Sequence, residues 1–230
     1  MNSEQLNSLQ KELKISANKI LQEEAEMIFL NELAENNLSA RVAFYGGTAL
    51  RLAYDSPRFS EDIDLFAIKT IPFSDFEKFI NNIAEQQSWK LADLKDKRQT
   101  AFALFKIEDE KLKHPFSLKI ELHKPKKRIE LRTELRMLKS PVSIFSPLLL
   151  VPSLQELKKL KEEAIADRKK ARDVFDLWYI SQLERSEFRL PGSTPAFKKK
   201  EFENELKVFL PPKYHSVIDQ LYEQTTKKDQ

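Results

Sequence analysis

Two aspartates of the sequence, Asp62 and Asp64, stand two residues apart in an apolar stretch. Because residues two apart in a β-strand point to the same face, their carboxylates would project together while Ile63 and Leu65 face a buried side. Adjacent carboxylates repel one another, and such a pair is stable mainly when a divalent cation neutralises it. Oxygen ligands select Mg²⁺ or Mn²⁺ over Zn²⁺. The spacing therefore predicts a metal site at Asp62 and Asp64.

A third acidic residue, Glu121, lies between two apolar neighbours in a segment typical of a strand. We expect this strand to lie beside the one with the aspartates, which would complete a set of three metal ligands. Glu108, Asp109 and Glu130 are near enough in sequence to compete for this third place. Three carboxylates holding two metal ions are an arrangement used for in-line attack of a hydroxyl on phosphorus. The acidic residues therefore predict a Mg²⁺- or Mn²⁺-dependent transfer at a phosphate.

A pair of glycines precedes the aspartates by about fifteen residues. The chain has only three glycines, and two of them, Gly46 and Gly47, are adjacent between a predicted strand and a predicted helix. Glycines at such a junction let the backbone turn tightly and bring its N–H groups to an anion at the helix N-terminus. We expect Gly46 and Gly47 to bind the phosphates of a nucleotide, with Thr48 or Ser60 as a hydroxyl donor.

Hydrophobic periodicity and turn residues predict the elements that position these groups. One or two amphipathic helices are expected over residues 5–36, and a helix over about 74–87 is expected to begin at a capping box, Ser74 to Glu77. Another capping box at Ser153 is expected to open a helical region that follows a proline-punctuated connection. Strands are expected at residues 41–45, 62–68, 89–94, 100–107, 116–123 and 129–132, with a helix at 48–54.

These elements predict an α+β (α/β) fold, with a small mixed sheet flanked by helices and a helical C-terminal region. We expect three parts: N-terminal helices at residues 1–36, a catalytic core at 37–151, and helices at 152–230. A chain of 230 residues with 41% hydrophobic content is long enough for this arrangement.

Composition narrows the class of protein further. The absence of cysteine excludes a disulfide framework, a thiolate zinc site and a cysteine nucleophile. The apolar runs are too short to span a bilayer and the N-terminus lacks an apolar signal core, so we expect a cytoplasmic protein without a membrane partner. Net charge is only +3, but basic residues crowd the stretches 119–136, 158–172 and 198–200, where an RNA backbone could bind.

Three blocks of sequence resemble a known family. They are FYGGTALRLAY at 44–54, RFSEDIDLF at 58–66 and KEEAIADRKKARDVFDLWYI at 161–180. The chain resembles the AbiEii/AbiGii toxin family of nucleotidyltransferases, within the DNA polymerase β-like superfamily, over about residues 40–185. The resemblance implies transfer of a nucleoside monophosphate from an NTP, commonly to the 3′ end of tRNA, by a toxin paired with a cognate antitoxin protein.

The third block adds candidate residues for binding the nucleotide. If residues 154–180 formed one unbroken helix, Lys161, Arg168 and Arg172 would lie along one stripe of it. Lys161 could then pair with the β- and γ-phosphates, and either arginine with a phosphate of nucleotide or RNA, while Asp173 or Asp176 orients one of these bases. The alternative is a solvated helix with ordinary charge pairs. Arg58, two residues before Ser60, is a further candidate contact to nucleotide or acceptor.

Two rival functions remain at this point. One is transfer of a nucleotide to a protein side chain, as in nucleotidyltransferases that act as antitoxins. The other is an RNA- or nucleotide-binding protein that keeps the fold without the chemistry. The presence of Asp62, Asp64 and Glu121 argues against the second, because a decayed site would be expected to lose a carboxylate.

Overall fold

The structure, a computed structural model, describes residues 1–125 and 130–226 of the chain. Its elements fall into two units by their contacts. The first unit comprises Met1–Asp55 and Phe59–Pro152, and the second comprises Ser56–Arg58 and the residues from Ser153 onward. The three residues 56–58 therefore belong to the second unit although their neighbours in sequence belong to the first.

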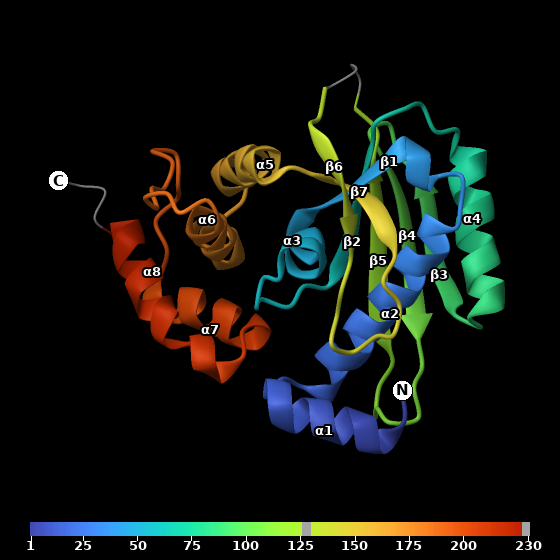
Figure 1. Cartoon of the computed structure of the whole chain (residues 1–230), viewed down its shortest axis with the longest axis horizontal. Helices are drawn as coiled ribbons and strands as arrows, with labels where there is room; N and C mark the ends of the chain where they lie inside the picture. The colour runs from blue at the N-terminus through green and yellow to red at the C-terminus, as the bar shows by residue number, and fades with distance from the viewer. Residues whose placement is uncertain (126–129, 227–230) are drawn as a thin grey trace. The chain divides into compact units, whose positions relative to one another are not determined.

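The first unit contains a five-stranded mixed sheet (Figure 1). β2 and β5 run parallel at its centre, and every other pair of neighbouring strands in it is antiparallel. Strong alternation of apolar and polar residues explains why β4 and β5 begin and end where the sequence predicts. In sheet order the strands are β1 (Val42–Tyr45), β2 (Asp62–Ala67), β5 (Phe116–His123), β4 (Thr100–Ile107) and β3 (Lys90–Asp96).

Two helices, α2 (Ala17–Ala34) and α4 (Phe73–Gln86), pack on this sheet. Their rings Phe29 and Phe79 meet edge to face at 5.5 Å, over the sheet face that carries the buried Ile63 and Ile120. α1 (Ser3–Leu13) packs on α2, and α3 (Gly46–Tyr54) lies against β1 and β2. The apolar face of the sheet is thus covered, while the face with the acidic residues remains partly exposed.

A separate two-stranded ribbon in this unit differs from the expectation. It consists of β6 (Thr133–Met137) and β7 (Leu148–Pro152) paired antiparallel. The strand predicted at 129–132 was wrong for residues 130–132, which are not in a strand, and Ile129 lies outside the described residues. The stretch punctuated by Pro141, Pro147 and Pro152 was expected to be a connection, but its residues 148–152 form a strand. Pro152 is the last residue of that strand, where a missing N–H is tolerated.

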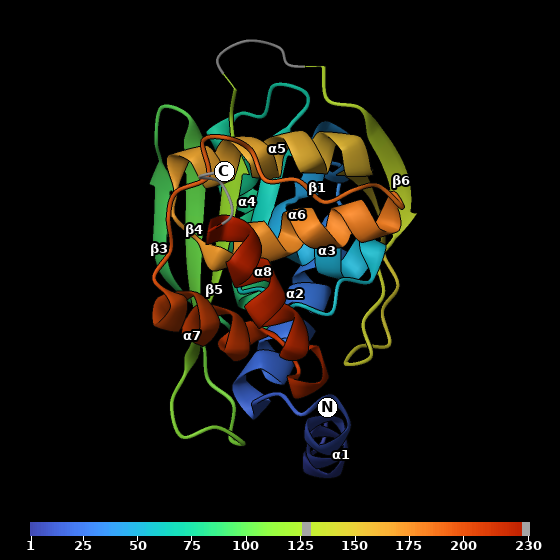
Figure 2. The ribbon, with the colours of Figure 1, turned by 90° about the vertical axis from the view of Figure 1, so that its left-hand side faces the viewer.

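The second unit is helical. α5 (Leu154–Asp167) and α6 (Ala171–Leu183) lie side by side and are followed by α7 (Lys199–Phe209) and α8 (Ser216–Thr226) (Figure 2). Short 3₁₀ helices occur at Pro212–Tyr214 here and at Ser39–Arg41 in the first unit. The unit has its own hydrophobic core around Phe175, Leu177, Phe202 and Leu206.

Two details of the helices correct the sequence analysis. The condition of one unbroken helix over 154–180 is not met: the segment forms two helices, because Arg168 and Lys170 have extended backbone dihedral angles. The expected capping box at Ser74 is absent, since α4 begins at Phe73 after Pro72 without a side-chain cap. The cap at Ser153 is present, and its hydroxyl accepts a hydrogen bond from the Glu156 N–H.

Among the helices of residues 1–125 and 130–226, none combines the length and the apolar character needed to cross a membrane.

Candidate active site

The parallel pairing of β2 with β5 places the three predicted carboxylates on one face of the sheet. Asp64 lies opposite Glu121 in the register, and Asp62 lies opposite Lys119. Paired residues of adjacent strands point to the same face, and so do residues two apart in a strand. The side chains of Asp62 and Glu121 are 27% and 38% exposed, so solvent reaches both. This arrangement makes a face of carboxylates open to a charged ligand.

A lysine shares this face with the carboxylates. The Lys119 Nζ lies 2.9 Å from the Asp62 Oδ2 and 3.6 Å from the Glu121 Oε2. Partial burial by itself lowers the pKa of Lys119, but the hydrogen bond to Asp62 and the charges of the carboxylates outweigh it and raise that pKa above its usual value. Lys119 therefore carries its positive charge between two of the predicted metal ligands.

The donor set of this face fits a hard divalent cation. All three side chains offer carboxylate oxygens, the ligands that Mg²⁺ and Mn²⁺ prefer, and the position of Lys119 shows that the face stabilises positive charge. Within residues 1–125 and 130–226, however, no three carboxylate or histidine side chains are already gathered closely enough to hold a metal ion. The ligands thus share a face, and binding a cation would require their side chains to converge.

Gly46 is packed directly against Asp64. Its backbone has a φ of +87°, in the region that favours glycine. A Cβ atom built on this residue would overlap the Asp64 carboxylate and lie 3.1 Å from its Cγ. Both the backbone conformation and the close approach require glycine here. The turn into α3 thereby brings its first N–H groups beside an acidic side chain of β2.

Thr48 connects α3 to the same strand. Its side chain is fully buried, and its hydroxyl donates a hydrogen bond of 2.5 Å to the backbone carbonyl of Asp62. In the structure this hydroxyl therefore holds β2 in place, and its predicted contact with a phosphate stays a prediction. Gly47 is buried in the first turn of α3, and Ser60 is partly exposed two residues before β2.

In the second unit, Lys161 and two aspartates form a buried cluster. The Lys161 Nζ lies 3.0 Å from the Asp173 Oδ1 and 2.6 Å from the Asp176 Oδ2. Lys161 and Asp173 are twelve residues apart, so in one straight helix they would be separated by about 18 Å. The break between α5 and α6 folds the chain back and makes the contact possible.

Arg58 is held by the same cluster. Its Nε and Nη2 donate to the two carboxylate oxygens of Asp176 at 2.7 and 2.8 Å, a bidentate pair in which both side chains are essentially fully buried. Burial raises the pKa of Asp176, but the charges of Arg58 and Lys161 outweigh it and lower that pKa to about 2. Asp176 is therefore ionised at neutral pH and holds two cations in position.

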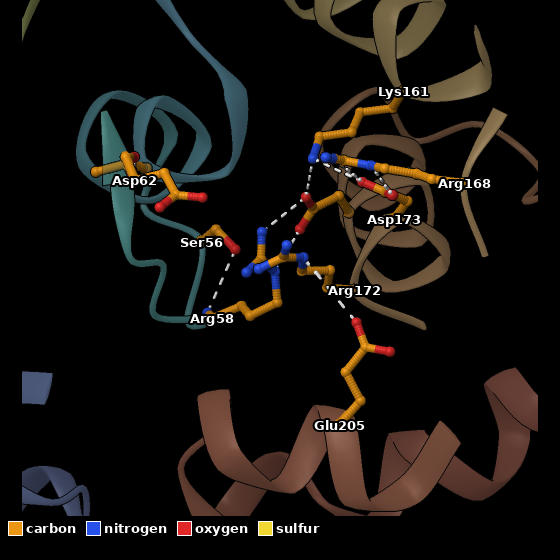
Figure 3. A network of polar contacts seen from close by, with 10 residues as sticks. Ser56, Arg58, Asp62, Lys161, Arg168, Arg172, Asp173 and Glu205 are labelled. Carbon is orange, nitrogen blue, oxygen red and sulfur yellow. Dashed lines mark hydrogen bonds and ion pairs between the residues drawn. The ribbon is translucent and has the colours of Figure 1, made fainter. Parts of the chain in front are cut away.

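The remaining basic residues of the third block differ in their exposure. Arg168 is half exposed and donates from Nε and Nη2 to Asp173 at 3.0 and 3.1 Å (Figure 3). Arg172 instead lies 4.0 Å from the Glu205 carboxylate of α7. The structure thus gathers Arg58, Lys161 and Arg168 around Asp173 and Asp176, and it places Arg172 beside this group with a different partner.

Two features near the site were missed from the sequence. Lys119 stands two residues before Glu121 in a strand, so the alternation that selected Glu121 could also have placed Lys119 on its face. The second is the pairing of Arg51 in α3 with the buried Glu23 of α2, which places the Arg51 guanidinium 3.5 Å from the centre of the Phe59 ring. No signal in the sequence indicates this long-range pairing.

A mixed sheet backed by helices, with a diglycine turn packed on a strand that bears two aspartates, defines a nucleotidyltransferase fold. Solved structures support this class. JHP933 of Helicobacter pylori matches with a TM-score of 0.60 and 18% identity over 93% of each chain. MenT4, a nucleotidyltransferase toxin of Mycobacterium tuberculosis, matches with a TM-score of 0.58 and 16% identity over 92% of this chain and 85% of its own. At such identities the likeness establishes the fold.

The family follows from the sequence itself. The profile of the nucleotidyl transferase AbiEii toxin family, type IV toxin–antitoxin system, matches residues 28–217. The chain belongs to this family and is a nucleotidyltransferase of the toxin class. No curated protein matches its sequence closely enough to add more. Enzymes of this class generally use divalent metals, and the family suggests an NTP substrate and a cognate antitoxin.

Proposed function

We propose that this protein transfers a nucleoside monophosphate from an NTP to the 3′ hydroxyl of an RNA, with tRNA as the acceptor, in a magnesium-dependent reaction. As the toxin of its pair it would act in the cytoplasm and be countered by an antitoxin protein. The observation that carries the proposal is the packing of Gly46 on Asp64, which joins a phosphate-binding turn to a carboxylate strand.

In this reaction the 3′ oxygen of the acceptor attacks the α-phosphorus of the NTP. A new bond forms between them, the bond from the α-phosphorus to the bridging oxygen breaks, and pyrophosphate leaves. Magnesium bound by Asp62, Asp64 and Glu121 would neutralise the charge that develops on the phosphate oxygens. One of these carboxylates accepts the proton of the attacking hydroxyl.

The turn at Gly46 and Gly47 contributes backbone N–H groups for the triphosphate, at the positive end of α3. The contact of Lys161, in the second unit, with the β- and γ-phosphates stays a prediction. Its ammonium has three N–H donors, and two of them are directed to Asp173 and Asp176. The third can donate to a phosphate oxygen while the two aspartates hold the ammonium in place.

The predicted contact of Arg58 with nucleotide or acceptor stays a prediction, and its buried ion pair suggests a positioning role as well. Because Asp176 takes up its guanidinium in a buried bidentate pair, Arg58 acts as a positioning residue for Asp176. Arg168 is the more accessible arginine of the cluster and is the better candidate to contact a phosphate of the nucleotide or RNA. The contact of Arg172 with substrate stays a prediction.

The proposal is tested by incubating the purified protein with Mg²⁺, each α-³²P-labelled NTP in turn, and total tRNA. We expect label on tRNA with one or more NTPs, and a loss of about a hundredfold or more in Asp64→Asn, because changes to groups that merely support metal ligands already cost 10–100-fold. Asp93→Asn, which removes a carboxylate of β3 that pairs with Lys95, should leave the rate unchanged.

Other outcomes of this experiment contradict the proposal in different ways. Label on protein in place of RNA would identify the protein-modifying transferase. Equal labelling by the wild type and Asp64→Asn would show that the reaction does not depend on Asp64. Absence of label with every NTP and acceptor would favour a binding protein without catalysis.

A further inference from the structure

Lys119 lies on the carboxylate face but has no role in the proposed transfer reaction. Parallel pairing puts Lys119 opposite Asp62, and its own strand puts it on the same face as Glu121. Its ammonium lies within 3.6 Å of an oxygen of each carboxylate. Any cation bound by those oxygens would therefore lie within a few ångströms of a positive charge.

We propose that Lys119 is an exchangeable counter-ion of the carboxylate face, which competes with the divalent metal for Asp62 and Glu121 and so sets the metal concentration at which the site loads. The inference rests on the proposed function, since it assumes that these carboxylates bind the metal. Three residues of the face support metal binding, and Lys119 would be a fourth residue that opposes it.

Electrostatics gives the direction of the competition. An ammonium satisfies a carboxylate by donating hydrogen bonds, whereas a metal ion takes the lone pairs of the same oxygens, so the two cannot share one oxygen position. They also repel one another at this distance. Asp62 and Glu121 must therefore turn from the lysine as the metal binds.

The exposure of the lysine makes this exchange feasible. Its side chain is 32% exposed, and the two carboxylates beside it are also reached by solvent. Ion pairs in such surroundings contribute little net stability, and a lysine has a flexible four-carbon stem that can move its charge into water. The contrast is with Lys161, which is 8% exposed and is held by two fully buried aspartates.

The carboxylate face also explains why a counter-ion is present. Asp62, Asp64 and Glu121 bring three negative charges together on adjacent strands, and like charges placed side by side destabilise a sheet. A lysine beside Asp62 and Glu121 offsets the repulsion whenever no metal does. Lys119 thus stabilises the metal-free site and, for the same reason, lowers the affinity of the site for the metal.

The test measures binding of Mn²⁺ alone to the protein and its variants, by electron paramagnetic resonance of the unbound ion. We expect Lys119→Met to bind Mn²⁺ about tenfold more tightly than the wild type. Lys106→Met is the matched control, because Lys106 donates to Ser117 at 2.8 Å and has no carboxylate partner among the described residues. Its affinity for Mn²⁺ should equal that of the wild type. Lys119→Gln, which keeps a polar side chain, should also bind more tightly and provides a second variant if Lys119→Met fails to fold.

A double variant separates failure of this inference from failure of the proposed function. If Asp62→Asn with Asp64→Asn binds Mn²⁺ as the wild type does, the carboxylates are not the metal site and both proposals are overturned. If the double variant loses binding while both Lys119 variants bind no more tightly than the wild type, only the role of Lys119 is overturned. Tighter binding in the Lys119 variants together with loss in the double variant supports both.

Discussion

The buried carboxylates of this chain differ in how their charge is satisfied. Asp176 accepts hydrogen bonds from Arg58 and Lys161, and its pKa falls to about 2. Glu26 of α2 is 1% exposed, and its Oε1 has no hydrogen-bond partner among the described residues. Burial, and secondarily the charge of Glu23, raise the pKa of Glu26 well above 4.5. Asp176 therefore stabilises the fold in its ionised form, whereas burial of Glu26 favours its protonated form.

Glu26 leads to a pH-dependent prediction. Because its folded-state pKa is raised, the folded state binds this proton more tightly than the unfolded state, and the free energy of unfolding falls as pH rises above about 4.5. Glu26→Gln removes the titration, so the variant should gain stability relative to the wild type between pH 5 and pH 7. Urea unfolding at the two pH values measures the change.

The control for this measurement is Glu12→Gln, which removes an exposed carboxylate from α1. Its stability relative to the wild type should stay constant over the same range. A Glu26→Gln variant that tracks the wild type at both pH values would show that Glu26 is ionised in the folded protein, contrary to the burial argument.

Among the helices and strands, the break between α5 and α6 has the largest effect on the buried cluster. It converts residues twelve apart in sequence into an ion pair and closes the cluster around Asp173 and Asp176. The bidentate pair of Arg58 with Asp176 is also buried here. Removing one partner of such a pair leaves an uncompensated charge in the interior, which costs about 3–5 kcal/mol.

We therefore predict that Asp176→Asn lowers the free energy of unfolding by about 3–5 kcal/mol at pH 7. The folded-state pKa of Asp176 is depressed to about 2 from 3.8, so its stabilisation is present above pH 4 and is lost as pH falls toward 2. The difference from the wild type should shrink correspondingly at pH 3. Chemical unfolding at both pH values is the measurement.

An exposed pair of the same unit provides the comparison for this prediction. Asp219 lies 3.1 Å from Lys199, and both side chains are more than half exposed. Asp219→Asn should cost less than about 1 kcal/mol. Equal losses in the two variants would mean that the buried cluster contributes no more than a surface ion pair.

The elements also show what sequence patterns can predict here. β4 and β5 have the predicted bounds because one of their faces is buried, which imposes alternation on the residues. The face of Asp62, Asp64 and Glu121 follows from the same alternation. The fold-back after Asp167 was not predicted, because residues 154–180 are helical in composition throughout and the break is stabilised by partners that only the folded chain brings together. β7 was missed because Pro147, just before it, and Pro152, at its end, are typical of a connection.

At the scale of the molecule, the residues with predicted roles are divided between two units. The carboxylates and the diglycine turn belong to the first, and Lys161, Arg168 and both aspartates of the buried cluster belong to the second. The segment Ser56–Arg58 belongs to the second unit, yet in sequence it separates α3 from β2. The chain therefore leaves the first unit and returns to it between the turn at Gly46 and the strand of Asp62.

Together, we propose, these residues add a nucleoside monophosphate to the 3′ end of an RNA. The most direct test of this proposal is the intact mass of tRNA after incubation with the protein, Mg²⁺ and unlabelled NTPs, followed by removal of the 3′-terminal nucleotide to locate the addition. We expect a gain of whole nucleoside monophosphate residues at the 3′ end with the wild type, and none with Asp62→Asn and Asp64→Asn combined. An unchanged mass with the wild type, or the same gain with both proteins, would contradict the proposal.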